Sequence, residues 1–300
     1  MKKYFWALLL GFASSQSLLA QDNAELITKT KWEKQKIAKG LFWEHFHFQE
    51  KSLFESNQNI NIIRTKLKNN KLIFGFLSAD DSLTIVQNGA LPKNRVLLTS
   101  KLAALNSAII AINGTFFDTK KGGSVDFFKM NGRVLDTTRA EIGKRAEHQL
   151  AAIAINQNKV MILKGEQTKI WDTALPYQNV MVTGPLLLYE GIVQDLKKSA
   201  FNDNRHPRTC ACITTKNELL LITVDGRTNE SNGLNLSELT LVCKQLKCKE
   251  AVNFDGGGST TLYIQNQPDN GVVNMPCDNK KFDHFGERPV SNGFGIWLKK

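Results

Sequence analysis

The sequence predicts an α/β (α+β) fold, in which a mixed β-sheet core with packed helices forms two pseudo-repeated helix–strand–hairpin halves around one cleft. Short β-prone runs dominate the chain, and turn sequences such as Asn131-Gly132 separate them. Two stretches, near residues 100–105 and 236–246, are predicted helices, and Asn235 is a candidate cap for the second. A repeated order of these elements is the third observation behind the fold class.

The repeat pairs the segment around Asn113 with the segment around Asn253. In each copy a helix precedes an apolar strand that ends in asparagine, and a hydroxyl-bearing turn, a strand, an Asn-Gly turn and a second strand follow. The two asparagines are 140 positions apart (253 − 113). We interpret the match as an ancient internal duplication, and the alternative is a chance similarity of two generic units. The duplication predicts that both asparagines face one pocket.

The N-terminus has the pattern of a secretory signal peptide over residues 1–20. Two lysines precede an apolar stretch over residues 4–13, which is too short to span a membrane as a helix. We therefore expect an exported protein, periplasmic or extracellular, without a membrane span. Residues 21–300 are predicted to form a single domain that opens with a polar arm or helix over residues 21–39.

The β-prone runs follow one another along the whole chain after this arm. The expected strands lie at residues 41–48, 60–65, 72–77, 108–112, 127–130, 134–135, 151–155, 160–163, 180–184, 186–189, 210–214, 219–224, 251–253, 262–264, 272–273 and 293–298.

The formal net charge is +11, and it falls to +9 without the two lysines of the signal peptide. A basic balance favours acidic partners such as phosphorylated glycans. The lysines are scattered along the sequence and are not clustered with aromatic residues, which argues against a nucleic-acid partner because such proteins carry a basic patch or stripe.

Five cysteines in an exported protein leave at least one without a partner in the chain. Cys243 and Cys248 flank a predicted helix end, where a turn could bring them within disulfide range. Cys210 and Cys212 share one face of a predicted strand and would pack about as readily as they would bond. No histidine or Cys-x-x-Cys pair stands at ligand spacing beside them, which disfavours a zinc site.

Four polar clusters stand at the ends of predicted strands, where a rigid frame presents side chains to a cleft. They are Asn113-Gly114-Thr115, His206-Pro207-Arg208-Thr209, Asp225-Gly226-Arg227 and the stretch from Asn253 through Asp255 to Thr260. Arginine offers a planar fork for phosphate, and glycoside cleavage uses paired carboxyl groups around C1. Asp-Gly alone also fits an ordinary turn, so it is the combination that predicts cleavage of a phosphate-linked sugar.

These residues resemble the phosphodiester glycosidase family. The matching motifs are Asn113-Gly-Thr-Phe-Phe117, Thr183-Gly-Pro185, His206-Pro-Arg-Thr209, Val224-Asp-Gly-Arg227, Gly233-Leu-Asn-Leu-Ser-Glu-Leu239, Asn253-Phe-Asp-Gly-Gly-Gly-Ser-Thr-Thr261 and Glu287-Arg-Pro-Val-Ser-Asn-Gly293. The resemblance covers roughly residues 37–300, and the Asn-x-Asp-Gly-Gly-Gly-Ser-Thr motif with an upstream Asp-Gly-Arg, in that order, is specific. Cys210, Cys212 and Phe254 depart from the family pattern, at positions inside strands.

The resemblance implies an α/β fold and hydrolysis of the bond between a sugar C1 and a phosphodiester oxygen, as in removal of N-acetylglucosamine from a phosphorylated or cell-wall-type glycan, with no obligatory metal or other cofactor. It implies that the catalytic residues are Asp255, Asp225 and Arg208. The substrate-binding residues implied by it are Asn113, Thr115, Arg227, Asn253, Gly256, Gly257, Gly258, Ser259 and Thr260. The roles of the two carboxylates as acid, base or nucleophile stay open.

Two other functions are compatible with the same residues. One is a non-catalytic binder of phosphorylated glycans. The other is a metal-dependent phosphodiesterase in which Asp225, Asp255 and Asn253 act as oxygen ligands of Ca²⁺ or Mg²⁺. The combination of Arg208 with both aspartates favours the glycosidase over the binder.

Overall fold

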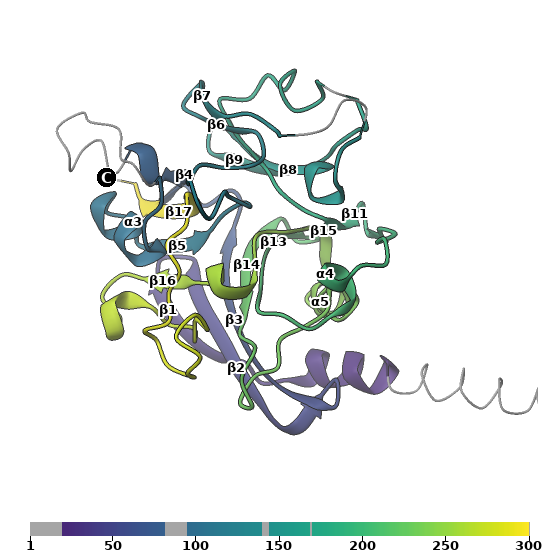
Figure 1. Ribbon diagram of the computed structural model, residues 1–300. Coiled ribbons are helices and arrows are strands. Elements are labelled where there is room, and N and C mark those ends of the chain that lie inside the picture. Colours follow the sequence, from purple (N-terminus) through teal and green to yellow (C-terminus); the bar gives the residue numbers. More distant parts are fainter. Residues whose placement is uncertain (1–19, 82–94, 140–143, 169, 300) are drawn as a thin grey trace, which may run out of the picture.

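The computed structural model describes residues 20–81, 95–139, 144–168 and 170–299 (Figure 1). The predicted signal peptide, apart from its last residue, therefore lies outside the described residues. The polar segment expected as an arm or helix divides in two, because residues 20–29 are helical and β1 (Glu33–Ala38) is a strand. Within the described ranges, none of the helices combines the length and the apolar composition needed to cross a membrane.

An eight-stranded sheet, antiparallel throughout, forms the largest layer. Across the sheet its strands are β1, β2 (Leu41–Leu53), β3 (Ser56–Lys66), β14 (Glu218–Val224), β13 (Arg208–Thr214), β15 (Cys248–Asn253), β11 (Leu186–Tyr189) and β12 (Ile192–Val193). The central strands β13 and β14 are buried on both faces along almost their whole length, and β14 is accordingly a nearly continuous apolar run.

Two smaller antiparallel sheets pack against this layer. One has the order β7 (Arg133–Asp136), β6 (Phe128–Met130), β10 (Asn179–Val182), β8 (Ala151–Asn156) and β9 (Lys159–Lys164). The other has the order β16 (Leu262–Ile264), β5 (Ile110–Asn113), β17 (Asn292–Leu298) and β4 (Leu72–Ser78). One buried core joins all three sheets, with Val252, Ile153 and Phe294 as members from each.

Helices cover the outer faces of the sheets. In Figure 1 the five-stranded sheet lies above β11, β13 and β15, and α4 (Ala200–Asp203) and α5 (Leu236–Gln245) lie below them. The predicted cap of α5 is confirmed, since Asn235 Oδ1 accepts from Glu238 N at 2.8 Å. The other predicted helix is α3 (Thr99–Leu105).

Two local predictions are wrong. The second strand expected at residues 272–273 is reduced to one bridge between Tyr263 and Val272, because Asp269–Gly271 forms a 3₁₀ turn. The suggested Cys243–Cys248 disulfide is replaced by Cys212–Cys248, with the Cα atoms 5.8 Å apart. Antiparallel pairing of β13 with β15 brings these two residues together, while Cys243 on α5 faces Cys210.

Loss of the disulfide in a Cys248→Ser variant should lower the free energy of unfolding by about 2–4 kcal/mol, because the bond links residues 36 positions apart and restricts the unfolded chain. Urea unfolding of the variant and the wild type measures this difference. Cys277→Ser is the matched control, since Cys277 is buried but not bonded. Denatured protein should contain three free thiols, and a count of five would contradict the pairing.

Candidate active site

The four predicted polar clusters meet where the three sheets approach one another. Arg208 begins β13, Asp225 directly follows β14, and Asn253 ends β15. Register brings these ends together, because Cys210 pairs with Asn253 and Arg208 with Val224. Antiparallel pairing thus places polar clusters that are far apart in the sequence next to one another at one end of these strands.

Asn113, at the end of β5, connects the small sheet to this region. Its side chain is fully buried, and its Nδ2 donates to the Asp255 backbone oxygen at 2.7 Å. Its Oδ1 accepts from Thr209 Oγ1 at 2.8 Å and from the Thr261 backbone N–H at 3.2 Å. The amide predicted to bind substrate therefore already has protein partners for both its nitrogen and its oxygen. This contact also joins the two asparagine-bearing strand ends, as the repeat requires, while the duplication itself stays a hypothesis.

Thr115 and Asn253 are also directed into the protein. Thr115 Oγ1 donates to the Val182 backbone oxygen at 2.6 Å. Asn253 Nδ2 donates to the backbone oxygens of Gly184, at 2.9 Å, and Phe254, at 2.6 Å. The buried Asn253 Oδ1 accepts no hydrogen bond from the described residues. Both side chains thus position the surrounding backbone.

Residues 255–261, here called the glycine turn, are held closely against neighbouring backbone. A Cβ atom on Gly256 would lie 2.6 Å from the Pro207 carbonyl oxygen, so no side chain fits there. Gly257 adopts φ +61°, which favours glycine, and its N–H donates to Pro207 O at 2.9 Å. A Cβ atom on Gly258 would collide with Asp278. The glycines are therefore required for close packing around Asp255.

Asp255 has an unusual electrostatic environment at the start of this turn. Burial is the main cause that raises the pKa of its carboxyl from 3.8 to about 6. The Ser259 side chain, the Gly256 N–H and the charges of Arg288 and His148 oppose that rise. Asp255 nevertheless keeps some exposed surface. It is therefore a carboxyl group that changes protonation near neutral pH and that a ligand can reach.

Asp225 is more deeply buried and is surrounded by donors. Its Oδ2 accepts from Asn59 Nδ2 at 2.7 Å, and its Oδ1 accepts from Asn274 Nδ2 at 2.8 Å and Met275 N at 3.0 Å. Burial raises its pKa, and these donors oppose the rise. Asn274 Nδ2 also donates to the Thr260 backbone oxygen at 3.1 Å. Asp225 thereby supports the glycine turn through Asn274.

The two predicted arginines have different surroundings. Arg208 is fully buried, and it donates from Nε to Leu234 O at 2.8 Å and from Nη2 to Phe201 O at 2.6 Å. Burial, followed by the charge of Arg227, lowers its pKa to about 10. Only Nη1 has no partner within the described residues. Backbone carbonyls therefore occupy most of the fork that was predicted to hold phosphate.

Arg227 is exposed and lies over the glycine turn. A Cβ atom on Gly257 would be 2.9 Å from Arg227 Nη2, and Arg227 Nη1 lies 4.0 Å from Cys277 Sγ. No aspartate or glutamate among the described residues forms an ion pair with it. Its guanidinium is therefore available for an anionic ligand next to this turn.

His148 is a candidate site residue that sequence reasoning missed. It lies in the 3₁₀ turn Glu147–Gln149, and its ring packs 4.9 Å from that of Phe116. Its Nε2 is 3.5 Å from Asp126 Oδ1, and its backbone packs directly on Gly184. The charge of His148 lowers the pKa of Asp255, so the two side chains are electrostatically linked. Its surrounding sequence matches none of the quoted motifs, and only the fold brings it here.

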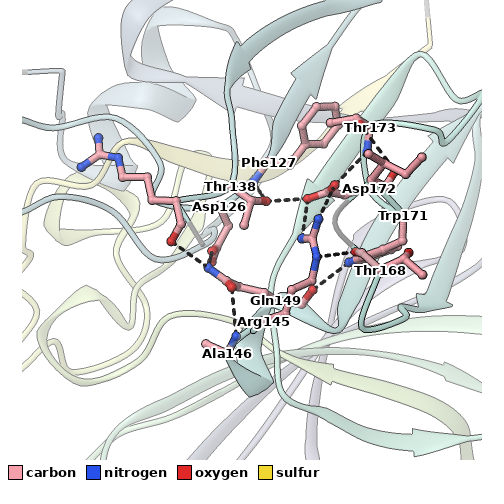
Figure 2. A network of polar contacts seen from close by, with 12 residues as sticks. Asp126, Phe127, Thr138, Arg145, Ala146, Gln149, Thr168, Trp171, Asp172 and Thr173 are labelled. Carbon is pink, nitrogen blue, oxygen red and sulfur yellow. Dashed lines mark hydrogen bonds and ion pairs between the residues drawn. The ribbon is translucent and has the colours of Figure 1, made fainter. Parts of the chain in front are cut away.

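A buried polar network fixes the turn that carries His148 (Figure 2). Gln149 Nε2 donates to Asp126 Oδ1 at 3.0 Å, and Gln149 Oε1 accepts from Ala146 N at 3.0 Å. Figure 2 shows Arg145 directed at Asp172, with hydrogen bonds of 2.8 and 2.9 Å to its two carboxylate oxygens. The backbone of His148 is thus held from both sides.

The sequence model described as phosphodiester glycosidase (NAGPA) matches residues 106–297. The chain belongs to the phosphodiester glycosidase family. Family membership places it among glycosidase-type hydrolases, and its mixed α+β fold agrees with the predicted class. No curated protein matches the sequence.

Solved structures share the fold of this family member. A zebrafish N-acetylglucosamine-1-phosphodiester alpha-N-acetylglucosaminidase catalytic domain, auto-inhibited by its pro-peptide, aligns with a TM-score of 0.63 at 19% identity, over 90% of this chain and 89% of that one. A hypothetical protein from Synechocystis aligns with a TM-score of 0.63 at 14% identity over 90% of this chain, which spans 64% of that protein's length. A Burkholderia pseudomallei protein aligns with a TM-score of 0.54 at 13% identity, over 81% of this chain and 74% of that one.

In this phosphodiester glycosidase, two cavities meet at His148. The larger, about 810 Å³, is lined by basic residues that include Arg139, Lys144 and Lys197. The smaller, about 310 Å³, is lined by Phe116, Pro185 and Phe201 among others. There is thus space for a ligand on the His148 side of the site. Nowhere in the described chain do three or more His, Cys, Asp or Glu side chains converge as a metal-binding group.

The raised pKa of Asp255 predicts a pH-dependent stability. Because the folded protein favours the protonated carboxyl, wild-type stability should fall as pH rises from about 4, near the pKa of the unfolded chain, to about 6. Asp255→Asn removes this titration, so above pH 6 it should be more stable than wild type by about 1–3 kcal/mol. Urea unfolding at several pH values measures the difference.

Asp283 provides the control for this effect, since the Phe285 N–H and Asn279 lower the pKa of its carboxyl. Asp283→Asn should give no gain in stability above pH 6. An Asp255→Asn variant whose stability relative to wild type stays constant between pH 4 and 7 would contradict the raised pKa.

Proposed function

We propose that the protein hydrolyses the bond between C1 of a sugar and the phosphodiester oxygen, releasing free sugar and a phosphomonoester. The observation that carries the proposal is Asp255, a reachable carboxyl group with a pKa of about 6 at the start of the glycine turn, together with the guanidinium of Arg227, which forms no ion pair with a described residue and lies over Gly257 of the same turn. The Asp255 carboxylate can act at the sugar C1, and the Arg227 guanidinium can bind the phosphate. Family membership supports this pairing of chemistries.

The proposed substrate is an N-acetylglucosamine-type sugar linked through phosphate to a glycan. Support for the sugar comes from the similar zebrafish protein, whose description names N-acetylglucosamine-1-phosphodiester as its substrate. The basic lining of the larger cavity, with Lys144 and Lys197, suits a phosphorylated glycan on the other side of the phosphate. The negative charge of the proposed substrate therefore complements the positive charge of the cavity lining.

The reaction follows from the charges of these groups. At neutral pH Asp255 is mainly ionised, and its negative charge stabilises the positive charge that develops at C1. The C1–O bond breaks with its electron pair moving to the phosphate, which Arg227 holds. A water oxygen bonds to C1, and the water proton passes to the Asp255 carboxylate. The leaving phosphate is already a stable anion, so it needs less help from a proton donor than an ordinary alkoxide.

Asp225 and Arg208 have positioning roles in this proposal. Asp225 fixes the glycine turn through Asn274, and Arg208 ties the start of β13 to the backbone at Phe201 and Leu234. Neither needs to contact the reacting atoms. The sequence predicted two reacting carboxylates, Asp225 and Asp255, and this proposal keeps only Asp255 as a reacting group.

We also propose that the protein is exported. The signal-like N-terminus supports this location, and so does the Cys212–Cys248 disulfide, because such bonds persist in oxidising compartments. The similar Burkholderia pseudomallei protein is described as a candidate exported protein.

Asp255→Asn should reduce kcat/KM for a sugar-1-phospho-alkyl substrate by about 10²–10⁴-fold, because the amide cannot accept the water proton. Asp225→Asn should retain more activity, since an amide oxygen in the place of Oδ1 can still accept two of the three hydrogen bonds, those from Asn274 and Met275. Asp283→Asn is the surface control. Release of free sugar is measured by coupled assay, with and without a chelator.

Three outcomes would contradict the proposal. Near wild-type activity of Asp255→Asn would exclude the assigned carboxylate. Release of sugar phosphate would show a phosphodiesterase instead of a glycosidase, and activity that disappears with the chelator would favour the metal-dependent alternative. Binding of the substrate without turnover would leave a glycan-binding protein.

His148→Gln should move the acidic limb of the kcat/KM profile to higher pH. Activity requires ionised Asp255, and the charge of His148 lowers the pKa of Asp255, so its removal raises that pKa. His45→Gln on β2 is the matched control, because His45 pairs with Glu33 on β1 and does not contribute to the Asp255 pKa. An unshifted limb in His148→Gln would contradict the electrostatic link.

A further inference from the structure

A basic pocket lies at the end of the eight-stranded sheet that is remote from Asp225. The Asp225 N–H donates to Asn59 O near the start of β3, and β3 continues from there to Lys66. Seven residue steps (66 − 59) of extended strand cover roughly 23 Å. The proposed active site therefore does not use this pocket.

The pocket has a volume of about 490 Å³ and a strong excess of positive charge. Its cationic lining residues are Lys34, Lys39, Arg64, Lys66, Lys68 and Lys71, and its acidic lining residue is Glu218. Lys34 and Arg64 are neutralised by Glu44 and Glu218 at 2.9–3.1 Å. The other four lysines form no ion pair with any described residue.

Hydrogen bonds between three turns build this pocket. Asn69, in the turn between β3 and β4, donates from Nδ2 to Lys39 O at 2.9 Å and accepts at Oδ1 from Lys71 N at 3.1 Å. The Leu67 N–H donates to Asn217 O in the turn between β13 and β14. Gly40 packs so closely that a Cβ atom would lie 2.8 Å from Asn69 Nδ2. The turns are thus held as one unit that presents its lysines to a shared space.

Four lysines that line one pocket without an ion pair repel one another, because like charges around one space are only partly screened at physiological salt, where the screening length is about 8 Å. An anion bound between them would relieve this repulsion. Lysine ammonium groups bind phosphate as point charges. The arrangement favours a ligand with phosphate groups over a neutral one.

We propose that this pocket is a second anion-binding site, which holds a phosphate group of a phosphorylated glycan away from the active site. Nucleic acid fits less well, because it requires an extended basic stripe with aromatic platforms for the bases. The one aromatic lining residue, Phe42, already carries Lys34 Nζ 4.3 Å above its ring. A multiply phosphorylated chain could occupy this site with one phosphate while another of its phosphates lies elsewhere on the protein.

Binding of phosphorylated dextran, measured by calorimetry with unmodified dextran as the neutral probe, tests the proposal. Wild type should bind the phosphorylated polymer, should not bind the neutral one, and should lose affinity as salt rises. The double variant Lys68→Glu with Lys71→Glu should bind at least tenfold more weakly. Its turnover of the small sugar-1-phospho-alkyl substrate should equal that of wild type.

The matched control makes the same charge change outside the pocket. Lys101→Glu on α3 with Lys244→Glu on α5 replaces two exposed lysines and should keep the wild-type affinity. Equal losses in both double variants would show general charge attraction and overturn the site. Unchanged affinity in the pocket variant, equal binding of neutral dextran, or tighter binding of a single-stranded DNA oligonucleotide would also overturn it. None of these binding results depends on whether the protein is a glycosidase.

Discussion

A buried amide, Asn113, connects the turn that carries Asp255 to two sheets. Its Nδ2 holds the Asp255 backbone oxygen, and its Oδ1 holds Thr209 of β13 and the backbone of Thr261. A buried amide that lost these partners would carry the full cost of unsatisfied polar atoms, about 1–3 kcal/mol for each. The position of the glycine turn is therefore coupled to the packing of β5 against β13, and the site depends on the whole core.

The same constraint explains why the glycine turn can hold a carboxyl group with a raised pKa. Exposed loops relax when a charge is desolvated, because water and side chains rearrange around it. Here Gly256 and Gly257 are fixed against Pro207, and Asn274 ties Thr260 to Asp225. Asp255 cannot move toward solvent without breaking these contacts. The contacts of the glycine turn therefore keep the Asp255 carboxyl buried, although burial of its charged form is unfavourable.

Motifs within short stretches of sequence could be predicted, and long-range arrangements could not. The strand ends at Asn113 and Asn253 and the cap at Asn235 follow from local patterns, and the family was recognised from them. The Cys212–Cys248 pairing depends on the register of β13 with β15, which local spacing does not reveal.

His148 and the basic pocket show the same limit in the site and on the surface. His148 influences the pKa of Asp255 only because its turn is fixed to Asp126 and packs on Gly184. The lysines of the pocket are scattered in the sequence, from Lys34 to Lys71, and three turns help to bring them together. Side-chain amides were predicted as ligand groups, although Asn113 and Asn253 mainly bind backbone. The residue types in the sequence indicated where the candidate site lies. The structure shows which of these side chains hold the backbone and which are left available to a ligand.

The loop that follows β16 joins the scaffold to the surface around the site. Asn274 anchors one end beneath the glycine turn, and Arg288 at the other end pairs with Asp278 beside Gly258. Between these anchors residues 278–281 and Phe285 are exposed, with Phe285 at 64%. Loop exchange between residues 279 and 283 would therefore change the surface beside the glycine turn, while His284 keeps its 2.8 Å contact with the Asn274 backbone oxygen. Such a division would let relatives diversify their specificity on an unchanged chemical centre.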